Sequence, residues 1–110
     1  MKVAVVGSRN FNNYELLKET LDKLNISLIV SGGAKGADSM SEVYAKEHGI
    51  ETLIFKPDWS LGRHAGFLRN ENIVNNCNVL VAFWDGKSSG TKHSIDLAYK
   101  KNKVIKIVNF

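Results

Sequence analysis

The sequence predicts an α/β fold, a doubly wound parallel sheet of about five strands in the order 3-2-1-4-5, with helices on both faces. Two observations favour this class. Five short apolar runs alternate strictly with four segments of helical periodicity, and such alternation implies right-handed crossovers between parallel strands. The runs are also almost continuously apolar, as expected for strands buried on both faces. Because 110 residues allow one sizeable core, residues 1–110 are expected to form a single domain.

The strands are expected where the apolar runs lie. The first run leads directly to Gly7, the second to a glycine-rich loop, and the third to Pro57. Glycine ends a strand because its backbone is flexible, and proline ends one because it has no N–H to donate to the sheet. The expected strands are 2–6, 28–30, 50–55, 79–83 and 104–108.

Helices are expected between these runs. Asn12 with Glu15 three residues later resembles a capping box, and Asn25 would end the first helix. The second helix should begin near 34–37 and end at His48-Gly49, and the third should span about 65–76 after a loop at 59–66. The inward-facing residues are expected to be Leu17, Leu21 and Leu24 in the first helix, Ala37, Met40 and Tyr44 in the second, and Ile95, Ala98 and Tyr99 in the last.

Composition excludes several classes of protein. No apolar run approaches the roughly 20 residues of a membrane span, and the N-terminal residues lead into a strand rather than a signal peptide. The lone Cys77 precludes an internal disulfide and suits the reducing cytoplasm. The three histidines lack metal-ligand spacing, so we expect neither a metal nor a cofactor. The net charge of +4 is spread along the chain, which leaves nucleic acid open as a partner.

The stretch Ser31 to Asp38 is the first candidate site. It follows a buried strand, contains three glycines and Lys35, and runs into a helix. Backbone N–H groups at a helix N-terminus favour an anion, and glycines let a ligand approach the backbone closely. A tight strand-to-helix turn alone would also account for two of these glycines. We expect the loop to hold a phosphate group.

Two more loops of similar composition, Gly7-Ser8-Arg9 and Trp84 to Thr91, follow the first and fourth strands. In the order 3-2-1-4-5 these strands are neighbours at the point where the winding reverses, and open α/β sheets bind ligands beyond the carboxyl ends of such strands. All three loops should therefore meet at one ligand site.

Individual side chains in these loops have both functional and structural interpretations. Arg9 could clamp a phosphate or be an exposed loop arginine, and Ser8 could bind the same anion or cap a turn. Asp38 could bond a ribose hydroxyl or the loop backbone. Thr91 near the start of the last helix could be a cap alone. Among the aromatic residues, Trp59, Phe83 and Trp84 could stack on a base. Phe83 is expected in the core, and Trp84 at the strand tip is the better stacking candidate.

The motifs resemble a known family. Gly7-Ser8-Arg9, Ser31 to Asp38, Gly66 with Arg69-Asn70, and Phe83 to Thr91 look like the small SLOG-superfamily proteins of the YspA and YpsA-related type. The resemblance covers essentially the whole chain and implies a Rossmann-like nucleotide-binding domain, often a sensor of signalling ligands, of bacterial or phage origin. It also suggests a homo-oligomer that completes its pocket with a partner.

The resemblance extends to the lonely-guy phosphoribohydrolases, which carry a helix arginine and a glycine-rich loop ending in Gly-Thr. Arg69 and Gly90-Thr91 match those features, but Lys92, His93 and Ser94 stand where a catalytic glutamate is expected. Asp96 is the nearest carboxylate. The DNA-processing protein A family is another relative, which implies single-stranded nucleic acid as an alternative partner.

The leading hypothesis is a protein that binds a nucleotide or nucleotide derivative and breaks no bond. The alternatives are an N-glycosidase for nucleoside monophosphates, with Arg69 and Asp96 or Asp38 as catalytic residues, and a single-stranded nucleic-acid binder. The residues expected to contact the ligand are Gly7, Ser8, Arg9, Ser31, Gly32, Gly33, Lys35, Gly36, Asp38, Arg69, Asn70, Trp84, Asp85, Gly86, Ser88, Ser89, Gly90 and Thr91.

Overall fold

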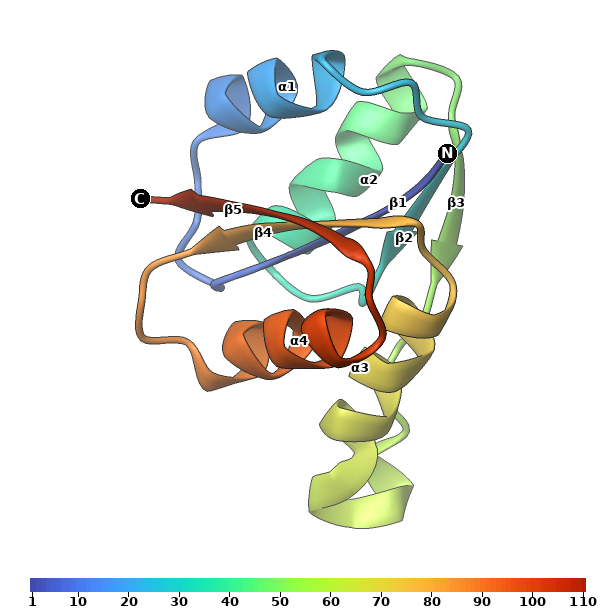
Figure 1. The fold of residues 1–110 in the computed structure, drawn as a ribbon, viewed down its shortest axis with the longest axis vertical. Coiled ribbons are helices and arrows are strands. Elements are labelled where there is room, and N and C mark those ends of the chain that lie inside the picture. The colour runs from blue at the N-terminus through green and yellow to red at the C-terminus, as the bar shows by residue number, and fades with distance from the viewer.

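A computed structural model describes residues 1–110 and shows five strands alternating with four α-helices (Figure 1). The strands are β1 (Lys2–Gly7), β2 (Leu28–Ser31), β3 (Glu51–Ile54), β4 (Val79–Trp84) and β5 (Val104–Asn109). The helices are α1 (Tyr14–Asp22), α2 (Ala37–Glu47), α3 (Ala65–Asn75) and α4 (Ser89–Lys100), with a 3-10 helix, η1 (Trp59–His64), before α3.

All neighbouring strands pair in parallel, and their order is β3-β2-β1-β4-β5. The predicted fold class and strand order are thus confirmed. The central strand β1 pairs with β2 on one side, where Val3 faces Ile29, and with β4 on the other, where Val3 faces Val79. The carboxyl ends of β1, β2 and β4 therefore lie along one edge of the sheet.

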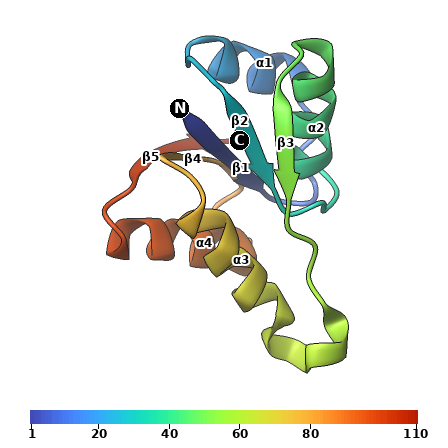
Figure 2. The ribbon, with the colours of Figure 1, turned by 90° about the vertical axis from the view of Figure 1, so that its right-hand side faces the viewer.

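The helices form two layers, and each layer covers its own core (Figure 2). Helices α1 and α2 pack on one face, where Phe11, Leu17 and Tyr44 belong to the larger buried cluster. Helices α3 and α4 pack on the other face with Ile73, Val74 and Ile95. Alternate residues of β1 and β4 enter the two cores, which explains why these strands are apolar on both faces. No helix is long and apolar enough to cross a membrane.

The first helix is shorter and differently capped than expected. Its N-cap is Asn13, not Asn12, because the Asn13 side chain accepts the N–H of Leu16 at 3.1 Å. The helix ends at Asp22, and the C-cap is Lys23 rather than Asn25. The peptide oxygen of Asn25 instead accepts a bond from the N-terminal amine at 3.0 Å, so this residue anchors the start of β1.

Two other expectations were wrong. The segment 59–64, expected as a loop, is the 3-10 helix η1, whose turn is opened by Asp58 as N-cap. Together with the start of α3 it projects from the body as an arm (Figure 2). Tyr99, expected on the inner face of α4, is 68% exposed. The buried stripe of α4 runs through Thr91, Ser94, Ile95 and Ala98, and the next residue is turned by about 100° toward solvent.

Candidate functional site

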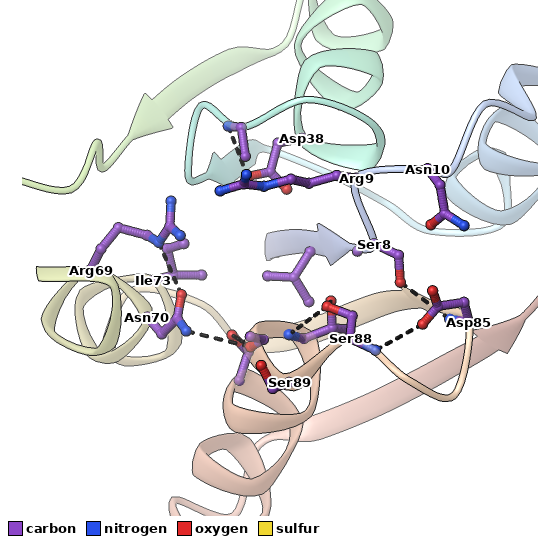
Figure 3. Close-up of a pocket in the computed structure, with 16 residues that line it drawn as sticks. Ser8, Arg9, Asn10, Asp38, Arg69, Asn70, Ile73, Asp85, Ser88 and Ser89 are labelled. Carbon is purple, nitrogen blue, oxygen red and sulfur yellow. Dashed lines mark hydrogen bonds between the residues drawn. The ribbon is translucent and has the colours of Figure 1, made fainter. Parts of the chain in front are cut away.

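A polar cavity of about 540 Å³ lies at the carboxyl ends of β1 and β4 (Figure 3). Its walls come from the β1–α1 loop, the β2–α2 loop, helix α3 and the β4–α4 loop. The residues that line it are Val6, Gly7, Ser8, Arg9, Asn10, Ala34, Asp38, Arg69, Asn70, Ile73, Asp85, Ser88, Ser89, Gly90, Thr91 and Ser94. Because so few of them are apolar, the cavity is suited to a polar or charged ligand.

The β1–α1 loop packs against both the β2–α2 loop and the β4–α4 loop. A Cβ at Gly7 would lie 2.6 Å from Cβ of Ala37 and 2.8 Å from the Phe83 oxygen, so only glycine fits between α2 and β4. The next residue, Ser8, is buried; its N–H donates to the Phe83 oxygen at 3.0 Å, and its Oγ accepts the N–H of Asp85 at 3.2 Å. Ser8 thus fixes the β4–α4 loop at the floor of the cavity.

The β2–α2 loop packs against the β1–α1 loop with no room for a side chain. Gly36 has a φ of +82°, and a Cβ there would lie 2.6 Å from the oxygen of Ser8. Inside this turn the N–H of Ala34 donates to Oδ2 of Asp38 at 3.2 Å. Asp38 is almost fully buried, and burial raises its pKa to about 6, an effect opposed by backbone hydrogen bonds and by the nearby Arg69 charge.

Helix α3 bridges the two glycine-rich loops. Arg69 donates from Nη1 to the oxygen of Gly32 at 3.0 Å and from Nε to Oδ1 of Asn70 at 2.9 Å. Asn70 in turn donates from Nδ2 to the oxygen of Gly90 at 3.4 Å, and the same nitrogen lies 3.1 Å from Nδ1 of His93. These two consecutive residues hold the β2–α2 loop and the start of α4 at opposite walls of one cavity (Figure 3).

The β4–α4 loop presents unpaired backbone amides. Asp85 accepts the N–H groups of Lys87 and Ser88, both at 2.9 Å, and these bonds hold its pKa below the ordinary range. Ser88 is the N-cap of α4 and accepts the N–H of Thr91 at 3.4 Å. The N–H groups of Ser89 and Gly90 have no acceptor in the protein. At a helix N-terminus such groups attract an anion.

Two guanidinium groups line the same cavity without an ion-pair partner. Neither Arg9 nor Arg69 has a carboxylate within 4.0 Å. Burial lowers the pKa of Arg69, an effect that the Asp38 carboxyl opposes and the Arg9 charge reinforces. Two positively charged side chains and two unpaired backbone amides thus belong to residues that line the same cavity.

The structure gathers most, but not all, of the predicted site residues. Those that line the main cavity are Gly7, Ser8, Arg9, Asp38, Arg69, Asn70, Asp85, Ser88, Ser89, Gly90 and Thr91. Gly32 and Gly33 line a second, adjacent cavity. Ser31, Lys35, Gly36, Trp84 and Gly86 line neither. Asp96 lies on the exposed side of α4, where it pairs with Lys92 at 2.9 Å, so the structure does not bring this proposed catalytic carboxylate to the cavity.

Of the aromatic residues, Trp84 differs from the sequence expectation, whereas Phe83 lies in the core as expected. Trp84 donates its indole N–H to the oxygen of Ser88 at 3.0 Å and packs against the α3–α4 core. It therefore stabilises the β4–α4 loop and does not face either cavity. Phe83 is fully buried. Trp59, on η1, lines the second cavity. The sequence did not lead us to expect Asn10 and Ala34 among the lining residues. Their positions in the chain, next to Arg9 and Lys35, could have suggested them.

Fold and site together define an α/β protein of the doubly wound class, with a polar cavity at the carboxyl edge of its sheet. The sequence model of the YspA, cpYpsA-related SLOG family (YAcAr) matches residues 1–62. Because this match covers more than half of the chain, the protein belongs to that SLOG family.

A solved structure shares the fold. The DNA processing protein A (DprA) from Streptococcus pneumoniae superposes with a TM-score of 0.79 at 24% sequence identity. The superposition covers 96% of this chain and 49% of the DprA chain, so this chain spans about half the length of that relative. No curated protein matches the sequence significantly.

Proposed function

We propose that this protein binds a nucleotide or nucleotide-derived ligand and anchors its phosphate group in the main cavity. One observation carries the proposal: the unpaired N–H groups of Ser89 and Gly90 lie at the wall of a cavity that also contains two arginines without ion-pair partners. Hydrogen bonds to a charged group are shorter and stronger than neutral ones. Membership of the SLOG family supports a nucleotide as the source of that phosphate.

The contacts of the remaining candidate residues indicate two kinds of role, either charge for the ligand or support for the loops. Arg9 and Arg69 would supply positive charge, and Ser8, Asp85 and Asn70 would hold the loops in place through the bonds described above. Gly36 and Trp84, which line neither cavity, would act only through the loop backbone. We propose a binding function without bond cleavage, as in a ligand sensor. A cytoplasmic location is consistent with the free and buried Cys77.

Substitution at Ser89 tests the proposal. Proline at this first helical position removes the N–H and is well tolerated there, because the preceding Ser88 already has the extended ψ of 116° that proline requires. Alanine at the same position keeps the N–H and is the matched control. Titration calorimetry with nucleoside monophosphates should show about tenfold weaker binding for Ser89→Pro and little change for Ser89→Ala. Absence of binding of any nucleotide to wild type, mono- or diphosphate and with any of the four bases, would contradict the proposal.

A phosphoribohydrolase activity is a second candidate, and Asp38 favours it. This buried carboxyl lines the cavity and has a pKa near 6, the range in which a carboxyl can exchange a proton at neutral pH. Incubation with nucleoside monophosphates would then release free base, and Asp38→Asn would abolish the release. Stable monophosphates in the presence of wild type would exclude this activity.

Single-stranded nucleic acid is a third candidate, since the DprA relative is by name a DNA-processing protein. Its binding would weaken steeply with added salt. Tight binding of oligonucleotides together with no binding of mononucleotides would favour this candidate over the first.

A further inference from the structure

A second cavity of about 370 Å³ adjoins the first beside the β2–α2 loop. Its lining residues are Arg9, Gly32, Gly33, Ala34, Lys56, Pro57, Trp59 and Arg69. Three of them, Arg9, Ala34 and Arg69, also line the main cavity. The two cavities are therefore halves of one surface depression, and a single ligand can occupy both.

The charges differ between the two halves. The main cavity contains two carboxyl groups, those of Asp38 and Asp85, whereas the second cavity contains none. Arg9, Lys56 and Arg69 all line the second cavity, and none of them pairs with a carboxylate. The Arg9 charge repels that of Arg69, and the Asp38 carboxyl offsets this effect at Arg69. With Lys56 added, the second cavity still has more positive than negative charge around it, which favours an anion of two or more charges.

The rest of the lining comes from the loops that follow β2 and β3 and from the arm. Gly33 has a φ of +71°, and a Cβ there would lie 3.2 Å from both Cγ2 of Ile54 and Cγ of Lys56. The loop thus lies against the stem of Lys56 with little free space. Beyond it, Trp59 is 62% exposed and offers a flat aromatic surface to a base.

We propose that the ligand is a nucleotide with two phosphate groups, which binds across both cavities. One phosphate binds the free amides of Ser89 and Gly90, the second lies among Arg9, Lys56 and Arg69, and the base stacks on Trp59. This inference rests on the proposed nucleotide binding and adds the ligand class. Lys56 and Trp59 are the residues that distinguish a diphosphate from a monophosphate.

Calorimetry in the presence of EDTA tests this assignment, because chelation keeps divalent cations from neutralising the second phosphate. The probes are the mono- and diphosphates of all four nucleosides. For the preferred base, wild type should bind the diphosphate at least tenfold more tightly than the monophosphate. Lys56→Ala should reduce this ratio to less than threefold and leave monophosphate binding nearly unchanged. Lys46→Ala, a lysine of the α2 C-terminus outside both cavities, should keep the ratio of wild type.

Tryptophan fluorescence tests the stacking contact separately. The chain has two tryptophans, and only Trp59 is largely exposed, so saturating diphosphate should quench wild type and leave Trp59→Phe nearly unquenched. Trp59→Phe should retain most of the affinity, whereas Trp59→Ala should lose about tenfold.

The two proposals fail in different ways. Equal affinities for mono- and diphosphates, unchanged by Lys56→Ala, would overturn the two-phosphate inference and leave the proposed function intact. No binding of any nucleotide would overturn both. Diphosphate preference with no fluorescence change and no effect of Trp59→Ala would overturn the placement of the base.

Discussion

Asp38 is a buried acidic residue, whereas most aspartates lie at the surface. Its carboxyl is buried beside the β2–α2 turn and accepts the N–H of Ala34. Burial raises its pKa from 3.8 to about 6. Between pH 3.8 and pH 6 the carboxyl is therefore protonated in the folded state but ionised in the unfolded state. The contribution of Asp38 to stability is therefore greatest below pH 4 and decreases as the pH rises through 6. At neutral pH the ionised group costs about 3 kcal/mol.

We predict that Asp38→Asn changes the pH dependence of stability. A neutral amide keeps a side-chain oxygen for the Ala34 N–H but has no charge to bury, so its melting temperature relative to wild type should rise by roughly 10 °C between pH 4 and pH 7. Thermal melts followed by circular dichroism at several pH values provide the measurement. Asp96→Asn, in an exposed ion pair on α4, is the control. A temperature difference independent of pH would show that Asp38 is not the titrating group.

Glycine is required in the β2–α2 loop for two separable reasons, conformation and space. Gly36 and Gly62 have the same φ of +82°, but a Cβ at Gly62 would meet nothing within 4 Å, whereas at Gly36 it would lie 2.6 Å from the Ser8 oxygen. Gly62→Ala should therefore cost the conformational strain of about 1–3 kcal/mol alone. Gly36→Ala should cost several kcal/mol in total, since backbone oxygen cannot move aside. Urea unfolding measures both, and equal losses would contradict the close approach of the two loops.

At the scale of elements, the start of α1 depends on a single side chain. Asn13 caps the helix by accepting the N–H of Leu16, and Asn12 makes no such bond. We predict a loss of about 1 kcal/mol in the free energy of unfolding for Asn13→Ala. Asn12→Ala should stay within about 0.5 kcal/mol of wild type, as usual for surface positions. Chemical denaturation of the two variants under the same conditions checks the cap, and the reverse ranking would move it to Asn12.

Helix α3 contacts the β2–α2 loop through Arg69 and the β4–α4 loop through Asn70. A substitution at one of these side chains should therefore loosen only the loop that it contacts. Arg69→Ala deletes the donor to the Gly32 oxygen and the Nε donor to Asn70, but keeps the Asn70 Nδ2 group that donates to the Gly90 oxygen. We predict about tenfold faster amide exchange at residues 32–36, the effect of one lost hydrogen bond, with little change at 88–91. Hydrogen exchange followed by NMR measures both loops. Arg63→Ala, on the exposed face of η1, is the control, and equal acceleration in both loops would contradict separate attachment.

At the scale of the whole molecule, the projecting arm is the largest departure from a compact outline. It exposes Leu61, Phe67 and Leu68, which are 58%, 51% and 46% accessible. Several large apolar side chains exposed together favour a protein contact, and we propose that the arm contributes to a homo-oligomer. Sedimentation velocity should show a species larger than the 12.2 kDa chain, and Leu61→Glu should shift it toward monomer. A wild type that sediments as monomer at all concentrations would refute the proposal.

The sequence anticipated the convergence of the loops because it depends on topology alone. Once strands are parallel and ordered 3-2-1-4-5, their carboxyl ends share an edge, and the loops after β1, β2 and β4 meet there. Arg69 and Asn70 were more difficult to place, since a helical residue reaches the cavity only if its helix has the right rotation. Their direct bonds to Gly32 and Gly90 were not deducible from spacing.

The positions of the tryptophans and of Asp96 could not be predicted from the sequence. Trp84 at the strand tip is a structural support with its indole bound to Ser88, and Trp59 lines the second cavity together with Lys56 and Pro57, which precede it in the chain. Asp96 follows the glycine loop in sequence, yet its position on α4 directs it to solvent and to Lys92. Asp38 reaches the cavity because α2 begins beside it.

By itself, the sequence determined the class of fold, the strand order and the edge of the sheet at which the glycine-rich loops meet, because apolar periodicity and glycine-rich turns are local signals that act within a few residues. Only the tertiary structure decided which amides stay unpaired, how deeply Asp38 is buried and that Trp59 lines a second cavity whose charged lining residues are all cations. Hydrogen-bond pairing, burial and cavity shape depend on contacts between segments far apart in the chain, and local patterns carry no record of those contacts.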